Sequence, residues 1–440
     1  MDILQNNKPA EQLQKRLGLD YWSQLILWAY ILTMPFVSAF AFTGTISLPL
    51  IFAVVLFFLM ILKVLQTGKL PIGFLGMDII IISLFLFLVV FSFLTNGLGN
   101  AKSLNHTIAY ISTLLLFYAG IKFTLFSISD RKYVLKKVLQ FITYTTIISA
   151  VFAAVEFTTS NFFGININNY IPRPSETEAW YDATVLALYY RARGFAPESG
   201  HFTFMMELFS PLVIYYFYFS GLCTWNRFLK GLWVLFIIFS FIFAVSTASF
   251  VIIPVAFLFA SLIYAKKIFL FIKRYFLKFI LSTAIISVII LILNYFFSFY
   301  ALIFLSITEK LDSDSFSDRE AKINFFYDNF SRFGPIKKLT GAGPAGNILL
   351  GFDESNSILS LYHSITFELG LSGLFLIILL FAYAIVGALS IKNRIGFFFL
   401  VSLISGVMHF YIIANFWYPW FWFIATFTVF YKTCNRFQTL

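Results

Sequence analysis

The chain has 440 residues, of which 60% are hydrophobic and 12% charged, with 60 phenylalanines and a formal net charge of +11. A soluble protein carries about 25% charged residues, so this composition excludes a soluble globular protein. The basic residues lie in short segments between apolar runs, which is typical of loops that orient a membrane protein and argues against nucleic-acid binding. The two cysteines, Cys223 and Cys434, indicate no disulfide framework.

The apolar runs predict an all-α polytopic membrane protein with about twelve transmembrane helices. Each run approaches the roughly 20 residues that cross a bilayer, and polar or Gly/Pro-bearing breaks separate the runs. No internal repeat or separate soluble domain is visible, so residues 1–440 are expected to form one integral membrane domain. The predicted spans are 21–42, 46–65, 78–95, 104–126, 134–157, 199–220, 229–245, 248–265, 277–305, 358–386, 395–413 and 415–431.

The distribution of Lys and Arg predicts that both termini are cytoplasmic. With that orientation most basic residues fall in cytoplasmic segments, as the positive-inside rule requires. Nearly all the exceptions lie in two long loops, 159–198 and 306–357, and long loops are exempt from the rule. Both long loops then face the extracytoplasmic side and carry most of the acidic residues. We therefore expect the chemistry of this protein at that face.

A first polar patch lies at the end of loop 159–198. Arg191 and Arg193 precede a predicted helix start, and two guanidinium groups suit a diphosphate or another anion. Glu198 is a candidate helix-capping acid, which the helix dipole favours. The alternative is that the arginines anchor at lipid headgroups and Glu198 only caps the helix. Glu207 lies two turns deeper, where a carboxylate is costly unless it is paired or faces water, so it is a further site candidate.

A second polar patch begins in loop 306–357. The run from Ser317 to Glu320 has the form of a capping box and predicts a helix over 318–332. This helix would lie on the membrane surface or against the bundle. Arg319 falls in its first turn, where the helix dipole disfavours a cation, and this favours an anionic ligand for Arg319. Apolar residues recur at helical spacing on one stripe: Ile323, Phe326, Phe330 and Phe333.

Two short motifs flank this helix. The run LTGAGPAGN could let the backbone amides of Gly341, Gly343 and Gly346 approach a phosphate, or it could be a plain structural turn. Asp312 and Asp314 form a D-x-D triplet of the kind that binds a divalent metal in nucleotide-sugar enzymes. Nucleotide sugars are cytoplasmic and this triplet is predicted outside, so a solvated acidic loop is the better interpretation.

The span 358–386 begins with polar residues. His363 and Glu368 share one broad helical face with serines, and His363 is a candidate proton-transfer group because imidazole titrates near neutral pH. The alternative for His363 is a hydrogen bond within the bundle. The other three histidines are scattered without metal-ligand spacing, so no metal and no cofactor is predicted. The aromatic residues at 411–422 are expected to form an interfacial belt.

Several of these motifs, in this order, resemble the O-antigen polymerase (Wzy) and O-antigen ligase superfamily. They are RARGFAPES before one span, SDRE at the start of a helix, LTGAGPAGN, and YHSITFELGLSGLFLIILL. The resemblance covers residues 190–390 in motifs and the whole chain in hydropathy. One departure is VSTASF at 245–250, where many relatives carry an Arg soon after the serine and this chain does not.

The resemblance implies a GT-C-like helical architecture and a glycosyltransferase that uses a polyprenyl-diphosphate-linked glycan without metal or nucleotide sugar. Arg193 and Arg319 would hold the diphosphate and His363 would lie at the catalytic centre, while Arg191 and Glu368 join them as substrate-binding candidates. His363 or Glu198 would deprotonate the acceptor hydroxyl in an inverting transfer.

The expected function is O-antigen polymerase in lipopolysaccharide biosynthesis. The protein would join undecaprenyl-diphosphate-linked repeat units at the periplasmic face of the bacterial inner membrane, with a chain-length regulator as a candidate partner. One alternative is an O-antigen ligase that transfers the glycan to lipid A core or to a protein. A second is a lipid-linked oligosaccharide flippase, although flippases tend to have short loops and charges deep in their spans.

Overall fold

The computed structural model describes residues 18–42, 46–128, 130–173, 184–185, 189–265, 314–352 and 358–437, with isolated residues between 284 and 295. These residues are helical apart from loops and one antiparallel pair of two-residue strands, β1 (Thr184–Val185) and β2 (Tyr189–Tyr190). The helices are α2 (Leu19–Thr33), α3 (Leu48–Thr67), α4 (Met77–Ser92), η1 (Phe93–Gly97), α5 (Ala101–Ser112), η2 (Thr113–Gly120), α6 (Ile121–Ser127), α7 (Arg131–Phe162), η3 (Ile167–Tyr170), α8 (Ser199–Tyr218), α9 (Arg227–Ala244), α10 (Thr247–Ile263), α14 (Asp314–Ser331), α15 (Pro335–Thr340), α16 (Gly346–Leu349), α17 (Leu361–Leu389), α18 (Arg394–His409) and α19 (Pro419–Phe437).

The prediction of an all-helical membrane protein is confirmed. A helix lies over each predicted span except 277–305, which falls largely outside the described residues. Among the described residues, six helical stretches are long and apolar enough to cross a bilayer. They are Leu48–Thr67, Met77–Gly97, Ala101–Ser127, Arg131–Phe162, Arg227–Ala244 and Leu361–Leu389.

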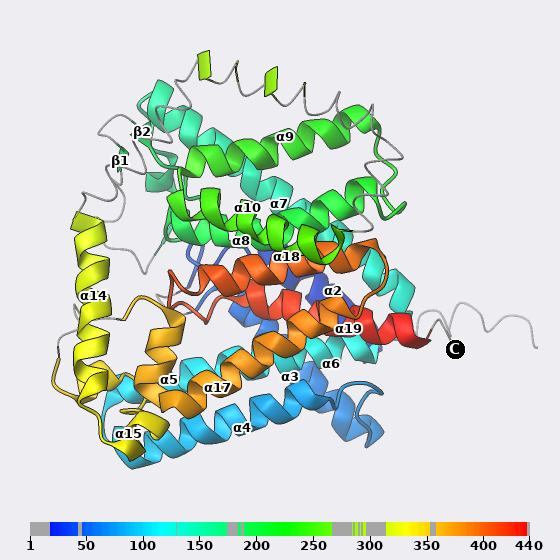
Figure 1. Ribbon diagram of the computed structural model, residues 1–440. Coiled ribbons are helices and arrows are strands. Elements are labelled where there is room, and N and C mark those ends of the chain that lie inside the picture. Colours follow the sequence, from blue (N-terminus) through cyan, green and yellow to red (C-terminus); the bar gives the residue numbers. More distant parts are fainter. Residues whose placement is uncertain are drawn as a thin grey trace, which may run out of the picture.

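The amphipathic helix of the second polar patch lies across the bundle rather than within it. Figure 1 shows α14 running across the ends of the long helices, while the end of α19 lies at the opposite end of the molecule. The predicted capping box is wrong, because α14 begins at Asp314 and Ser317 is therefore inside the helix. The predicted apolar stripe is confirmed, since Phe326 and Phe333 are buried against Phe367 of α17.

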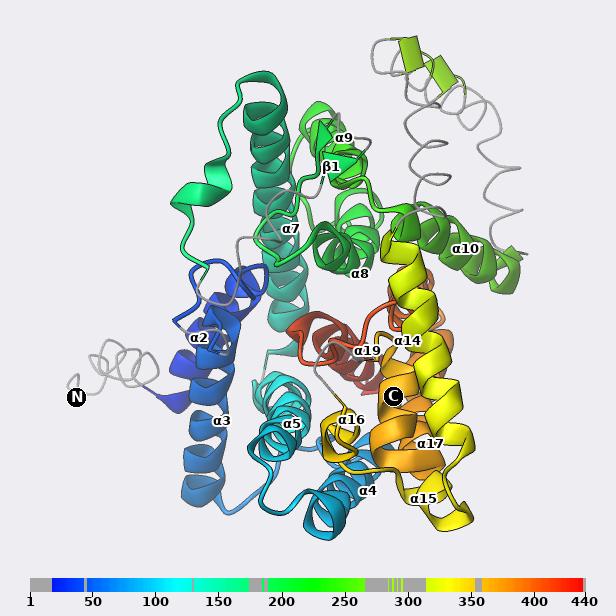
Figure 2. The same cartoon turned by 90° about the vertical axis from the view of Figure 1, so that its left-hand side faces the viewer.

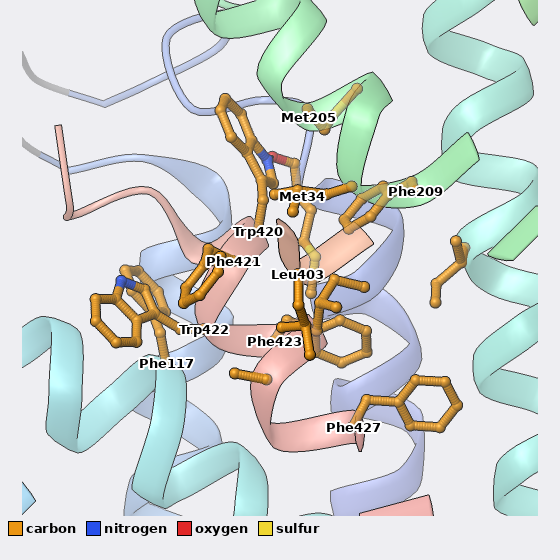
Figure 3. Close-up of a cluster of buried hydrophobic side chains, with 14 of the residues drawn as sticks. Met34, Phe117, Met205, Phe209, Leu403, Trp420, Phe421, Trp422, Phe423 and Phe427 are labelled. Carbon is orange, nitrogen blue, oxygen red and sulfur yellow. The ribbon is translucent and has the colours of Figure 1, made fainter. Parts of the chain in front are cut away.

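The core of the bundle is aromatic and surrounds α19 (Figure 3). Trp420 and Trp422 are almost completely buried, so the expectation that the aromatic residues at 411–422 form an interfacial belt is wrong for these two. Their indole N–H groups donate to the carbonyl oxygens of Met34 at 2.7 Å and Phe416 at 2.5 Å. A tryptophan is readily buried when its N–H finds such an acceptor.

A kink in α17 fixes the position of the Gly-rich turn. Gly370 has φ of +69° inside α17, and a Cβ there would lie 2.2 Å from the carbonyl oxygen of Leu339. The N–H groups of Ala342 and Gly343 donate to the carbonyls of Phe367 and Glu368 at 2.8 and 2.9 Å. These two backbone N–H groups therefore attach the turn to α17 and are not available to a phosphate. This favours the interpretation of LTGAGPAGN as a structural turn.

A buried carboxylate shapes the loop that carries the first polar patch. Glu156 of α7 accepts hydrogen bonds from the backbone N–H groups of Arg193 and Gly194 at 3.1 and 2.8 Å, and from the Asn168 side chain at 2.6 Å. Arg173 donates to the carbonyls of Gly194 and Ala196. These contacts hold residues 193–196 in a tight turn just before α8.

Candidate functional site

Two adjoining cavities lie at the end of the bundle crossed by α14. Their volumes are about 950 and 420 Å³. Figure 2 looks onto this end and shows α3 and α5 on one side, with α16, α17 and α14 on the other. Six residues line both cavities and form what we call the junction: Lys102, His106, Glu198, His201, Asn415 and Trp417.

The two cavities differ in chemistry. The larger one extends between α3 and the α5–η2 segment, where its walls are mainly aliphatic and aromatic: Leu50, Val54, Ile108, Leu116 and Phe117. The smaller one adds a cation, a carboxylate and hydrogen-bonding groups: Arg319, Glu368, Tyr110, Asn347 and Ser364. An apolar cavity thus adjoins a polar one at the junction. A ligand with an apolar tail and a charged or sugar-bearing head matches this pattern.

The first polar patch contributes Glu198 to the junction. Glu198 is the N-cap residue of α8, where the helix dipole favours an acid, although its side chain makes no capping hydrogen bond. Arg193 is buried and its guanidinium donates to the Pro197 carbonyl at 3.1 Å. Arg193 is absent from the described linings of the two cavities, and its role in binding a diphosphate stays a prediction.

Arg191 lies close to the second polar patch. Its Nε donates to the Ala244 carbonyl at 3.2 Å. Burial lowers the pKa of the Arg191 guanidinium, the carboxylate of Glu198 opposes that shift, and the positive charge of Arg319 adds to it. The structure therefore brings Arg191, Glu198 and Arg319 together, although they come from different loops and helices. Two cations whose charges act on each other favour an anionic ligand nearby.

Glu368 has two side-chain partners in the site. It is buried on α17, and its Oε1 lies 3.1 Å from Nδ1 of His106 on α5. Its Oε2 accepts a hydrogen bond from the Tyr110 hydroxyl at 2.9 Å. Tyr110 is itself held by stacking on Phe416, with ring centroids 4.2 Å apart. Glu368 lines the smaller cavity while its two oxygens contact His106 and Tyr110, and its role in substrate binding stays a prediction.

His363 lies apart from this group. Its ring stacks on Phe326 of α14 at a centroid distance of 4.5 Å and contacts the rings of Tyr327 and Tyr411. His363 is absent from the described linings of both cavities. The structure thus places the predicted catalytic histidine in an aromatic cluster that joins α14 to α17, and its catalytic role stays a prediction.

Glu207 is paired deep within the bundle. Its Oε2 lies 2.9 Å from Nδ1 of His409 on α18, and both side chains are buried. This pairing satisfies the expectation that a carboxylate at this depth needs a partner. Glu207 is absent from the described linings of the two cavities.

The described residues contain no group of three or more His, Cys, Asp or Glu side chains that could hold a metal ion. Asp312 of the D-x-D triplet lies outside the described residues, and the triplet is therefore not tested.

Sequence reasoning missed much of the junction. In the sequence, His106 and His201 have no metal-ligand spacing, and Trp417 fits an interfacial belt. Lys102 and Asn415 lie in no motif. A local signal exists for α5, whose first turns carry Lys102, Asn105 and His106 at a predicted outer helix end. No local signal shows that α5 faces Glu368, which lies 262 residues further along the chain.

No protein-family model matches the chain, and no curated protein matches its sequence. The resemblance to the O-antigen polymerase and ligase superfamily therefore stays a prediction.

Proposed function

We propose that this protein is a glycosyltransferase of the O-antigen polymerase type. It would join undecaprenyl-diphosphate-linked repeat units at the periplasmic face of the bacterial inner membrane. The observation that carries the proposal is the junction, where an apolar cavity meets a polar one among a carboxylate, two imidazoles and a cation.

The parts of the site match the parts of such a substrate. The aliphatic walls of the larger cavity suit a polyprenyl segment. Arg319 and Lys102 supply positive charge for a diphosphate, which must be stabilised as it leaves. Asn347, Asn415 and Trp417 suit a sugar, because amides bind hydroxyl groups and an indole packs on the apolar face of a pyranose ring.

The test uses the full-length chain in liposomes with a synthetic undecaprenyl-diphosphate-linked repeat unit as both donor and acceptor. The expected product is a ladder of glycans with two or more repeats, resolved by gel electrophoresis and mass spectrometry. Transfer to added lipid A core without a ladder would identify a ligase instead. If no glycan is transferred to either acceptor but the lipid-linked repeat unit moves between the leaflets, the protein is a flippase.

We also propose twelve spans in a GT-C-like arrangement with both termini cytoplasmic. The support is that helices lie over the predicted spans within the described residues. Ile72 and Ile336 give a matched test, because both side chains are more than three-quarters exposed and the proposal places them on opposite sides. In a Cys223→Ser, Cys434→Ser background, a membrane-impermeant maleimide should label Ile336→Cys in spheroplasts, and Ile72→Cys only after permeabilisation. The reverse pattern would invert the topology.

A further inference from the structure

A carboxylate and an imidazole at the junction form a pair with the geometry of a catalytic dyad. Glu368 is only 5% exposed at its side chain, whereas His106 is 34% exposed and lines both cavities. Both members line the smaller cavity, but Glu368 is almost buried and His106 is the more exposed of the two. In hydrolases a buried carboxylate orients an exposed imidazole in this way.

The contact between the two side chains favours one tautomer of His106. Glu368 Oε1 lies 3.1 Å from His106 Nδ1, and a carboxylate in its ionised form only accepts hydrogen bonds. In the tautomer that fits this contact, Nδ1 carries the proton and the lone pair is on Nε2. A base needs that lone pair on the nitrogen directed away from its orienting carboxylate.

Glu368 is held from several sides. Tyr110 donates to Oε2 at 2.9 Å, and the backbone carbonyl of Glu368 accepts hydrogen bonds from the N–H of Gly343 and from the Ser92 hydroxyl. The turn at Gly341–Gly343 and the kink at Gly370 thus fix the segment that carries the carboxylate. A rigid orienting group limits the imidazole to one rotamer and one tautomer, as efficient proton transfer requires.

We propose that His106 is the general base of the glycosyl transfer and that Glu368 is its positioning residue. This inference rests on the proposed function. The acceptor hydroxyl oxygen attacks the anomeric carbon while the bond from that carbon to the diphosphate oxygen breaks, and its electron pair leaves on the diphosphate. The hydroxyl proton moves to Nε2 of His106 and then to solvent. Arg319 and Lys102 stabilise the charge on the leaving group.

The experiment measures chain extension in liposomes for His106→Ala, Glu368→Gln and His363→Ala. We expect His106→Ala to lower kcat at least about 100-fold with little change in donor binding, which is the usual contribution of a general base. Added imidazole should restore part of that rate, because a small base can enter the space that the side chain leaves. A purely structural histidine would show no such rescue.

Glu368→Gln should lower kcat about 10-fold or more while KM changes little, because an amide still accepts from Nδ1 but supplies no negative charge. The matched control is Glu320→Gln, which makes the same change at an exposed residue of α14, and it should behave as the wild type. Retention of the wild-type kcat in His106→Ala would overturn the proposal. So would a result in which added imidazole restores the activity of His363→Ala but not that of His106→Ala. Failure of the wild-type protein itself to extend chains would instead reject the proposed function.

Discussion

Arg319 and Arg193 show how differently two predicted anion-binding arginines are placed. Arg319 lines the polar cavity, close enough to Arg191 for its charge to act on that residue. Arg193 donates to the Pro197 carbonyl and has its backbone N–H bound to Glu156. At the scale of single residues, Arg319 therefore has access to a ligand, and Arg193 shapes the loop that presents Glu198.

Arg319→Ala should lower kcat for glycan transfer on the order of 100-fold, because a positioned donor to the leaving oxygen is lost. Arg319→Lys should lie between this variant and the wild type, since an ammonium keeps the charge but loses the fork of donors. Steady-state kinetics in liposomes provide the measurement, and Arg332→Ala, at an exposed arginine just after α14, is the control. Equal rates for Arg319→Ala and Arg332→Ala would remove Arg319 from the site.

At the scale of elements, the decisive contact is the docking of α15 and the Gly-rich turn on the kink of α17. Two glycines with positive φ, Gly341 and Gly370, approach the backbone of the other segment so closely that a Cβ would lie 2.2 Å from a carbonyl oxygen. Neither position accepts a side chain without separating the segments. The kink also places Glu368 directly before the break, where it reaches His106.

Gly370→Ala should lower the free energy of unfolding by about 3 kcal/mol or more, since both the clash and the strained φ oppose folding. It should lower activity as well, because Glu368 would lose its fixed position. Thermal unfolding in detergent and the liposome assay measure the two effects. Gly231→Ala, at an α9 glycine with open space around it, is the control. An unchanged melting temperature in Gly370→Ala would contradict this account of the kink.

The sequence predicts these elements better than it predicts their contacts. Apolar runs and the Phe326–Phe333 stripe are local patterns, so the spans and the helix of the second patch could be located. The start of α14 was placed too late because a capping motif can also occur inside a helix. The pairing of His106 with Glu368 depends on how α5 packs against α17, and neither segment carries that information alone.

At the scale of the whole molecule, a buried ion pair lies at the end opposite the junction. Lys122 donates to both carboxylate oxygens of Asp78 at 2.8 and 2.7 Å, and the Tyr118 hydroxyl donates to the same carboxylate. Asp78 and Lys122 are completely buried. Figure 1 shows α6, which carries Lys122, at the far end of the bundle from α14. Neither residue is among the described lining of the two cavities, so the pair lies apart from the site.

Asp78→Ala should lower the free energy of unfolding by about 3–5 kcal/mol, because Lys122 would be left as an uncompensated buried charge. The double variant Asp78→Ala, Lys122→Met should recover much of this loss. The kcat of the folded fraction should stay at the wild-type value in both. Unfolding in detergent and activity per folded protein are the measurements. A loss of kcat without a loss of stability would show that the two ends are coupled.

The length of α17 has a consequence for where the polar residues of the site sit in the bilayer. Its 29 residues make about 43 Å of helix, counted over the two parts on either side of the kink at Gly370, whereas the hydrocarbon layer is about 30 Å thick. Counted back from Leu389, which precedes Lys392 and Arg394, the roughly 20 residues that fill this layer end at Gly370. The turns that carry His363 and Glu368 then stand in the headgroup layer. In that layer the carboxylate of Glu368 avoids the cost of entering hydrocarbon. It also lies at the same depth as the phosphate groups of the lipids.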